Sequence, residues 1–278
     1  MYNYDSYPTE RRNPRSMEID CMSAIEIATL INEEDKTVPF AVEKELQSIA
    51  AAIEGIAARL KDGGRLFYIG AGTSGRIGVV DAAECPPTYG TPPETVQALI
   101  AGGQGAMFRA VEGAEDNGDL AVEDLLNTSL TEKDAVVGIS ASGSAEYVRS
   151  GLLFAKKAGA LTVALSCNKQ GATTSVADIA IAPEVGAEVI SGSTRMKAGT
   201  AQKIVVTMIS TGVMVLLGRV RGNLLVHMDP SNKKLIDRAT RIICSETGAG
   251  AGDAREALIG NNNDILLAIQ ELKNKGTA

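Results

Sequence analysis

Five short apolar runs, most of them separated by segments with helical spacing, constrain the fold of this chain more than any other feature. The runs lie at 65–69, 96–100, 135–139, 161–165 and 178–182. Short runs rich in Val, Ile, Leu and Ala are typical of buried strands. Strands that alternate with helices form right-handed βαβ units around a parallel sheet. We therefore predict an α/β fold, a three-layer αβα sandwich with a mainly parallel five-stranded sheet.

The spacing of apolar residues predicts the helices on either side of that sheet. Ahead of the first strand we expect helices over 19–31 and 38–60, the second ending at Asp62-Gly63-Gly64. Further along we expect helices over 74–83, 120–126, 145–158, 195–219, 233–244, 253–259 and 264–272. The predicted organisation is an N-terminal arm and helix (1–45), a domain built on the sheet (46–227) and a small C-terminal helical region (228–278).

A glycine-rich turn, Gly70–Gly75, follows the first strand and opens a helix. The free N–H groups and the positive dipole end of a helix N-terminus favour an anion. The spacing also matches the dinucleotide fingerprint, which needs an acidic residue at the end of the second strand. That strand is followed by Ala101-Gly102-Gly103, and the turn carries the hydroxyls of Thr73 and Ser74. We therefore expect a compact phosphate monoester rather than NAD.

A second hydroxyl-rich turn follows the third strand and also opens a helix. It carries Ser140, Ser142 and Ser144 around Gly143. Serine caps helices for structural reasons, so one such turn would be weak evidence. Because the carboxyl ends of parallel strands meet at one edge of the sheet, two such turns favour a phosphate site there.

A third polar segment, 186–197, leads into the long helix predicted from residue 195. It contains Glu188, Ser193, Arg195 and Lys197. Cations are disfavoured at the N-terminus of a helix. The presence of Arg195 and Lys197 at that position therefore indicates an anionic neighbour, although a solvated first turn is the alternative.

Two glutamates would lie at the same edge of the sheet as the hydroxyl-rich turns. Glu84 follows the first turn, within Asp-Ala-Ala-Glu-Cys-Pro-Pro, and Glu115 follows the second strand. Two carboxylates around one substrate can divide acid and base roles if their environments separate their pKa values. The alternative for each is an ordinary surface charge. We interpret the neighbouring Cys85 as a structural thiol rather than a nucleophile.

Composition excludes several other classes of protein. A net charge of −7 argues against a nucleic-acid-binding surface. Four scattered cysteines and one histidine argue against a zinc site. The polar first sixteen residues hold no signal-peptide core, and the apolar stretch 204–217 is interrupted and short for a membrane span. We expect a cytoplasmic protein with free thiols, no metal site, and no nucleic-acid or membrane partner.

Two segments leave alternatives open. Residues 1–16 form either a disordered tail or an arm that docks on its own or a partner subunit. The apolar helix over 195–219 is either buried in its own domain or part of a homodimer interface. We predict a homodimer, because a single sheet edge leaves the site open and this helix is very apolar.

Several long motifs resemble the N-acetylmuramic acid 6-phosphate etherase family, whose domain is of the sugar-isomerase (SIS) type. They read GAGTSGR, DAAECPP, AVEGAED, ISASGSAEYV and GAEVISGSTRMKAGTAQK. The opening TERRNPRSMEID also fits, so that the resemblance covers nearly the whole chain. The last and longest motif is shared with the glucokinase regulatory protein, a non-enzymatic relative, and marks sugar 6-phosphate binding more than catalysis.

The resemblance implies hydrolysis of the C3 lactyl ether of N-acetylmuramic acid 6-phosphate to N-acetylglucosamine 6-phosphate and D-lactate. It implies elimination followed by hydration, without a metal or redox cofactor, in the recovery of cell-wall amino sugars. A sugar-phosphate isomerase and a non-catalytic sugar-phosphate sensor on the same fold are the alternatives.

The resemblance also assigns roles, residue by residue. It implies that Glu84 protonates the leaving lactate oxygen and that Glu115 is the base at C2. The phosphate would be held by Thr73, Ser74, Ser140, Ser142 and Ser144. The sugar site would be lined by Glu188, Ser193, Arg195 and Lys203.

Overall fold

The computed structural model describes residues 7–276, and these divide into two compact units. The first comprises the residues up to Ala82 together with Glu94–Val213. The second comprises Ala83–Pro93 together with the residues from Met214 onward. Two long helices, α4 (Gly72–Tyr89) and α7 (Lys197–Leu216), contribute residues to both units.

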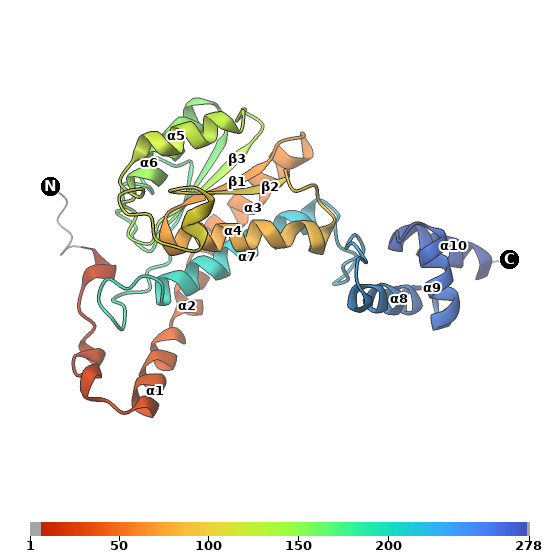
Figure 1. Ribbon diagram of the computed structural model, residues 1–278, viewed down its shortest axis with the longest axis horizontal. Coiled ribbons are helices and arrows are strands. Elements are labelled where there is room, and N and C mark those ends of the chain that lie inside the picture. The colour runs from red at the N-terminus through yellow and green to blue at the C-terminus, as the bar shows by residue number, and fades with distance from the viewer. Residues whose placement is uncertain (1–6, 277–278) are drawn as a thin grey trace. The chain divides into compact units, whose positions relative to one another are not determined.

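The first unit is built on a five-stranded sheet whose strands all run parallel, in the order β2-β1-β3-β4-β5 (Figure 1). The strands are β1 (Leu66–Gly70), β2 (Val96–Ile100), β3 (Ala135–Ile139), β4 (Leu161–Leu165) and β5 (Ile179–Ile181). The predicted fold class and all five strand positions are confirmed. The chain reverses direction along the sheet between β2 and β3, which puts the β1 and β3 ends side by side at the switch point, where ligands bind in such folds.

Helices cover both faces of this sheet. The helices α5 (Gly118–Asn127) and α6 (Glu146–Lys157) pack on one face, and α3 (Leu46–Lys61), α4 and α7 lie on the other (Figure 1). Neighbouring residues of β1 show the division, since successive side chains of a strand point to opposite faces. Ile69 faces Gly151 of α6, whereas Tyr68 faces Gly78 of α4.

Helix α7 is long and apolar enough to cross a membrane by length and composition alone. Half of its most apolar window is buried inside the protein, and Ala198, Val205, Ile209 and Val213 have no exposed surface. Its Ser210 donates a hydrogen bond to the carboxylate of Asp81 on α4. This is the pattern of a core helix in a soluble protein.

The predicted helix over 38–60 is divided in the structure into α2 (Val38–Glu43) and α3. The break lies at Glu45, whose backbone leaves the helical region. Its carboxylate accepts a hydrogen bond from the backbone N–H of Ala182, 3.1 Å away. A long-range contact therefore overrides the continuous apolar spacing.

The helix predicted at 19–31 begins later, as α1 (Ala24–Asp35). A capping box between Ser23 and Glu26 fixes its start, while Ile19–Cys21 form a short 3₁₀ turn. Two further 3₁₀ turns, Pro8–Glu10 and Pro14–Ser16, shape the segment before it.

The second unit contains the three predicted C-terminal helices, α8 (Lys233–Thr247), α9 (Ala251–Gly260) and α10 (Ile265–Gly276). Apolar side chains from all three form one core with Val226 and Met228. The end of α4 belongs to this unit as well. Gly90 has a positive φ, and a Cβ there would lie 2.2 Å from the carbonyl oxygen of His227. Only glycine fits this close approach.

Candidate functional site

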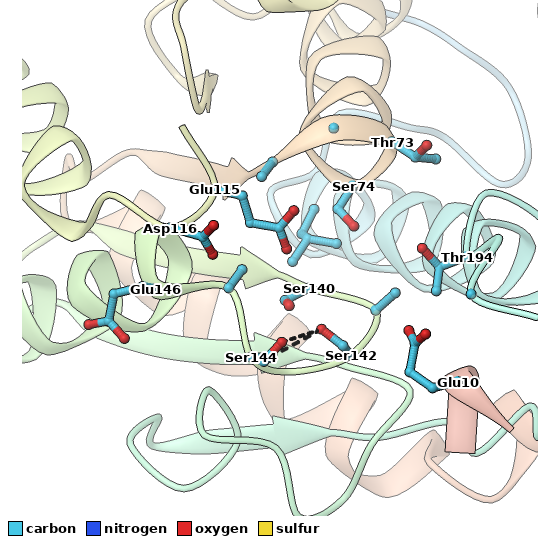
Figure 2. Close-up of a pocket in the computed structure, with 16 residues that line it drawn as sticks. Glu10, Thr73, Ser74, Glu115, Asp116, Ser140, Ser142, Ser144, Glu146 and Thr194 are labelled. Atoms are coloured by element: carbon cyan, nitrogen blue, oxygen red, sulfur yellow. Dashed lines mark hydrogen bonds between the residues drawn. The ribbon is translucent and has the colours of Figure 1, made fainter. Parts of the chain in front are cut away.

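A cavity of about 770 Å³ lies at the carboxyl edge of the sheet, at the ends of β1 and β3 (Figure 2). This volume is typical of small-molecule sites. Most of its polar side chains are hydroxyls and carboxylates. The lining residues are Glu10, Ala71, Gly72, Thr73, Ser74, Glu115, Asp116, Ile139, Ser140, Ala141, Ser142, Ser144, Ala145, Glu146, Gly192 and Thr194.

The first wall is the turn from β1 into α4. The backbones of Gly70 and Gly75 lie so close together here that a Cβ on Gly70 would be only 2.8 Å from the nitrogen of Gly75. The helix begins at Gly72, which has a positive φ, so that Thr73 and Ser74 border the cavity from the first turn. Ser74 is buried and donates a hydrogen bond to Gln202 of α7, 3.0 Å away.

The second wall is the turn from β3 into α6. The hydroxyls of Ser142 and Ser144 are 2.7 Å apart (Figure 2). The Ser140 hydroxyl accepts a hydrogen bond from the N–H of Gly143. Gly143 has a positive φ, and a Cβ there would meet Ser166 and Gly171 at 2.7–2.8 Å. The two hydroxyl-rich turns predicted from sequence therefore face one cavity.

Glu115 and Asp116 reach the cavity from the loop between β2 and α5 (Figure 2). The loop is fixed where the N–H of Tyr147 donates to the carbonyl of Glu115, at 3.0 Å. The side chain of Glu115 is exposed in the cavity, but the surrounding protein reduces the hydration of its carboxylate. This desolvation, together with the charge of Asp116, raises the pKa of Glu115. A carboxylate with a raised pKa is a stronger base than an ordinary surface glutamate.

The N-terminal segment forms another part of the wall. Glu10 borders the cavity beside Gly192 and Thr194 (Figure 2). The hydroxyl of Ser191 donates to the carbonyl of Glu10 at 2.7 Å, and the N–H of Gly192 donates to the carbonyl of Thr9 at 3.2 Å. Of the alternatives for residues 1–16, the described part is thus an arm that docks on its own chain; residues 1–6 lie outside the described residues.

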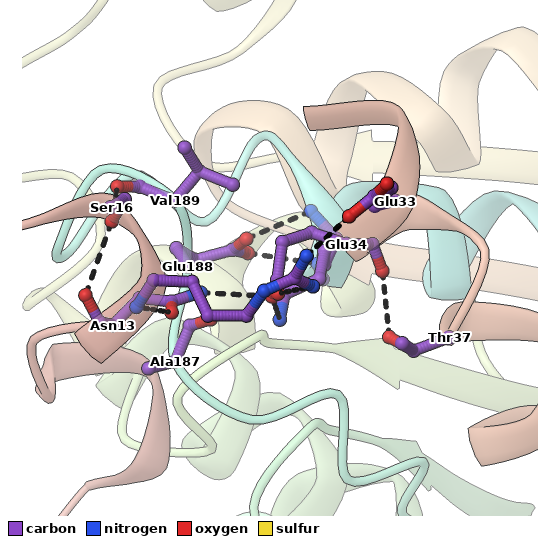
Figure 3. Close-up of polar contacts among 11 residues, drawn as sticks. Asn13, Ser16, Glu33, Glu34, Thr37, Ala187, Glu188 and Val189 are labelled. Atoms are coloured by element: carbon purple, nitrogen blue, oxygen red, sulfur yellow. Dashed lines mark hydrogen bonds and ion pairs between the residues drawn. The ribbon is translucent and has the colours of Figure 1, made fainter. Parts of the chain in front are cut away.

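A buried polar network fastens this arm and α1 to the start of α7 (Figure 3). The ammonium of Lys197 lies 2.6 Å from the carboxylate of Glu34, and these side chains are only 4% and 8% exposed. Asn13 donates to Glu34 at 2.8 Å, and Arg15 pairs with it at 2.9 Å. Burial acts to raise the pKa of Glu34, but these hydrogen bonds and the Lys197 charge outweigh it and lower the pKa.

Glu188 lies in the same region and is fully buried (Figure 3). Its two carboxylate oxygens accept hydrogen bonds from the backbone N–H groups of Lys197 and Ala198, both at 2.9 Å. It therefore caps α7 and complements the helix dipole. Burial raises its pKa despite these bonds. The anionic neighbour expected for Lys197 is thus supplied by the protein itself, through Glu34 and Glu188.

Comparison with known proteins identifies close relatives over nearly the whole chain. A family model for the glucokinase regulatory protein N-terminal SIS domain matches residues 48–156. An N-acetylmuramic acid 6-phosphate etherase of Clostridium beijerinckii is 54% identical, over 96% of this chain and 88% of its own length. One from Mesorhizobium japonicum is 50% identical, over 97% of this chain and 88% of its own. The chain belongs to the N-acetylmuramic acid 6-phosphate etherase family.

Solved structures share the fold at low identity. A protein of Escherichia coli CFT073, solved as a complex, aligns with a TM-score of 0.52 and 20% identity, over 73% of this chain and 97% of that one. A phosphoheptose isomerase from Neisseria gonorrhoeae aligns with a TM-score of 0.51 and 17% identity, over 69% and 97%. These likenesses confirm the SIS-type fold on which the etherase family is built.

The cavity brings together six of the residues that the etherase resemblance assigned. They are Thr73, Ser74, Glu115, Ser140, Ser142 and Ser144. The other five are not among its lining residues. Glu188 is the buried cap of α7, Ser193 is half-buried just before that helix, and the side chains of Arg195 and Lys203 are exposed. Glu84 is exposed on the part of α4 that belongs to the second unit.

Helix α4 also continues beyond the predicted end at residue 83, so that Glu84 lies within it rather than on a loop. Pro86 and Pro87 are in its last turn. These prolines lack the N–H groups that would bond the carbonyls of Ala82 and Ala83, and the helix ends soon afterwards at Tyr89.

Four polar lining residues were not singled out by sequence reasoning: Glu10, Asp116, Glu146 and Thr194. Asp116, Glu146 and Thr194 lie within the quoted motifs AVEGAED, ISASGSAEYV and GAEVISGSTRMKAGTAQK, so the sequence could have indicated them. Glu146 carries its own partners, Arg149 and Ser150, at 2.9 Å. Glu10 depends on the docking of the arm, for which spacing along the chain gives no signal.

All four cysteines of the chain are free thiols. Cys85 and Cys167 are buried, and burial with the nearby Glu188 charge raises the pKa of Cys167 to about 12. Such a thiol is a poor nucleophile. Within residues 7–276, no three His, Cys, Asp or Glu side chains gather in a group that could hold a metal ion.

Proposed function

We propose that this protein cleaves the C3 lactyl ether of N-acetylmuramic acid 6-phosphate. The products are N-acetylglucosamine 6-phosphate and D-lactate. The observation that carries the proposal is the cavity in which two hydroxyl-rich helix starts face Glu115, a carboxylate of raised pKa. Full-length similarity to relatives named as etherases supports it.

The hydroxyl-rich turns are suited to the phosphate end of the substrate. Thr73 and Ser74 begin α4, and Ser140, Ser142 and Ser144 precede α6. Helix starts supply backbone N–H donors and a favourable dipole, and the serine hydroxyls add further donors. The Ser74 hydroxyl already donates to Gln202, so in this role it would donate to the phosphate in place of Gln202.

Glu115 is suited to the proton at C2. In the ring-opened sugar the aldehyde at C1 makes this proton acidic. Glu115 takes the proton, the C2–C3 double bond forms, and the C3–O bond breaks while the ether oxygen gains a proton. D-Lactate leaves, water then adds at C3, and a proton returns to C2. Acid and base groups positioned for such steps contribute about 10²–10⁴-fold each.

Glu84 is the residue assigned to protonate the ether oxygen, and this role rests on the etherase resemblance alone. Its replacement by glutamine should lower turnover by roughly 10²-fold. Mixing inactive Glu84→Gln and Glu115→Gln chains adds a second measurement. Recovered activity would mean that Glu84 reaches the cavity from another copy, whereas full activity of Glu84→Gln alone would remove it from the mechanism.

Ser193 and Arg195 remain proposed contacts of the sugar, because they adjoin the cavity residue Thr194. Lys203, in the second turn of α7, remains one on the etherase resemblance alone. We propose an indirect part for Glu188. By capping α7 it holds the segment that carries Gly192 and Thr194 in place.

One assay tests the function. Purified protein is incubated with N-acetylmuramic acid 6-phosphate, and D-lactate is measured. Release of D-lactate with equimolar N-acetylglucosamine 6-phosphate is the expected result. Binding of the sugar phosphate without D-lactate would instead identify a sensor, and a changed sugar without lactate release would identify an isomerase. Either outcome contradicts the etherase proposal.

We further propose a homodimer in the cytoplasm. Large apolar side chains are exposed in the first unit, with Ile25 at 73% and Phe40 at 67%, and such exposure is typical of surfaces that associate. Light scattering should give twice the mass of the chain, and Ile25→Glu with Phe40→Glu should shift it to one chain. A monomeric wild type would contradict this.

A further inference from the structure

A second cavity adjoins the one that holds Glu115, and it differs from the first in charge. It has a volume of about 220 Å³. Ala71, Gly72, Glu115 and Asp116 line both cavities, so the two meet at these residues. The remaining wall comes from α4 and from the loop between β2 and α5.

Arg76, on α4, lines the second cavity. Of the described residues that line the two cavities, it is the only lysine or arginine. The carboxylates of Glu10, Glu112, Glu115, Asp116 and Glu146 surround the same space. Outside the two hydroxyl-rich helix starts, an anionic group in this space would meet carboxylates and one cation, so Arg76 is the charged group that can bind it.

The guanidinium of Arg76 is held in place without being neutralised. Its Nε donates to the carbonyl of Met107 at 3.0 Å, and one terminal nitrogen donates to the carbonyl of Ala106 at 2.8 Å. In the described part of the chain, no carboxylate lies within ion-pair distance of it. The two bonds use two of the five N–H groups of a guanidinium. The others are available to an anion in the cavity.

The proposed substrate carries two anionic groups on opposite sides of the bond that breaks. One is the phosphate, for which the hydroxyl-rich turns are suited. The other is the carboxylate of the lactyl group, attached through the ether oxygen at C3. Glu115 borders both cavities and would then lie between the two anionic ends, beside C2 and C3. A cavity of 220 Å³ is large enough for a group of the size of lactate.

We propose that Arg76 binds the carboxylate of the lactyl group, and that the smaller cavity is the binding site of the leaving lactate. The proposal rests on the proposed etherase function. In this position Arg76 distinguishes a lactyl ether from a sugar phosphate that lacks it, because a guanidinium recognises carboxylates in a fixed geometry. It is a binding residue and takes no part in proton transfer.

The test compares two substrates in the wild type and in two variants of the protein. The substrates are N-acetylmuramic acid 6-phosphate and its lactyl carboxamide, which keeps the shape and loses the charge. Wild type should lose about 10- to 100-fold in kcat/KM on the carboxamide, the range for a hydrogen bond to a charged group. Arg76→Gln should lose a similar factor on the acid and then treat acid and amide alike. Arg76→Lys should recover part of the preference for the acid.

Two controls separate recognition from a structural effect. Binding of N-acetylglucosamine 6-phosphate, which has no lactyl group, should stay within about twofold in Arg76→Gln. Arg109→Gln removes an exposed guanidinium from the same loop and should leave both substrates unchanged. If Arg76→Gln weakens N-acetylglucosamine 6-phosphate binding as much as it slows the etherase, Arg76 serves the phosphate or the loop and the proposal is overturned.

The wild-type measurement stands even if Arg76→Gln does not fold. Equal kcat/KM on the acid and the carboxamide would show that the protein does not recognise the charge of the lactyl carboxylate, which also overturns the proposal. Wild type that releases no D-lactate from the acid would instead reject the etherase function. The two failures are therefore distinct.

Discussion

The carboxylates at the two edges of the sheet have opposite environments. At the amino edge, Asp134 accepts hydrogen bonds from the N–H groups of Arg65 and Thr131, both at 2.8 Å, and pairs with the Arg65 guanidinium at 2.9 Å. At the carboxyl edge, Glu115 faces an open cavity beside a like charge, Asp116. The first arrangement surrounds the carboxylate of Asp134 with hydrogen-bond donors from the protein. The second leaves the carboxylate of Glu115 facing a cavity that a ligand could enter.

The pKa values follow the same division. Burial acts to raise the pKa of both Asp134 and Asp178, but bonds from Arg65, Lys156 and Thr162 outweigh it, and both pKa values are lowered. At Glu115, burial and the Asp116 charge act together, and the pKa is raised. Strong hydrogen bonding at one edge serves stability, and the raised pKa of Glu115 at the other edge suits the proton transfer that we propose for it.

The largest effect should come from Glu115→Gln, which removes the proposed base but keeps its shape. We expect kcat to fall by roughly 10²–10⁴-fold while N-acetylglucosamine 6-phosphate still binds. D-Lactate release and isothermal titration measure the two quantities. Glu123→Gln, an exposed carboxylate on α5, is the matched control and should keep full activity. Normal turnover in Glu115→Gln would show that Glu115 is not the base, and that the two edges of the sheet do not differ in function in the way proposed.

Asp134→Asn probes the opposite edge and should act on stability alone. It leaves the Arg65 charge half-buried without its partner, so unfolding free energy should fall by about 2–3 kcal/mol. Urea unfolding measures this, and kcat per folded molecule should not change. Asp62→Asn at the same edge breaks only an exposed pair with Lys133 and should change stability by less than about 0.5 kcal/mol. Equal losses in both variants would contradict the contrast.

Acidification should separate activity from folding. A lowered carboxyl pKa contributes stability that is present above the ordinary value and is lost as the pH falls through the folded value. Asp134 and Asp178 thus hold the fold to below their ordinary pKa of 3.8. Asp81, whose pKa burial raises to about 6, favours folding when it is protonated. Glu115 becomes protonated above its ordinary 4.5, so the base is lost while the fold remains.

The measurement is a pH profile of kcat beside circular dichroism at the same pH values. Activity should disappear on the acid side before helix content does. Coincident loss of both signals would mean that unfolding, and not Glu115, limits activity in acid.

The smallest effect should come from Ser142→Ala at the carboxyl edge. It removes one hydroxyl from the turn and one partner of Ser144, at 2.7 Å. We expect KM to rise about 5- to 10-fold with kcat nearly unchanged, since a neutral hydrogen bond contributes about 1 kcal/mol. Ser175→Ala, which removes an exposed hydroxyl from another loop, is the control. An unchanged KM would place the phosphate elsewhere.

Local sequence patterns predicted the sheet and two of the cavity walls because each depends on neighbouring residues. Every strand is an apolar run bounded by turn residues. A turn that carries hydroxyls and precedes a helix indicates an anion site. The strand ends then meet at one edge by topology alone. For the same reason Glu115, which follows β2, was expected near the cavity and lines it.

Contacts between distant segments were not predictable in this way. The break at Glu45 depends on Ala182, and Glu188 accepts its hydrogen bonds from the start of α7. A glutamate within a sugar-phosphate motif has the same appearance whether it binds substrate or caps a helix. Glu10 lines the cavity only because the arm docks on Ser191 and Gly192. Nothing in the local spacing of residues 7–16 specifies that partner.

This docking has a consequence for the order in which the protein acquires its site during synthesis. Glu10 and Ser191, which together close one wall of the cavity, are 181 residues apart. At about 5–20 residues per second, the ribosome delivers the second partner roughly ten to forty seconds after the first. The first described residues of the chain must therefore wait for nearly the whole sheet before they find their place. The cavity is among the last parts of the first unit to form.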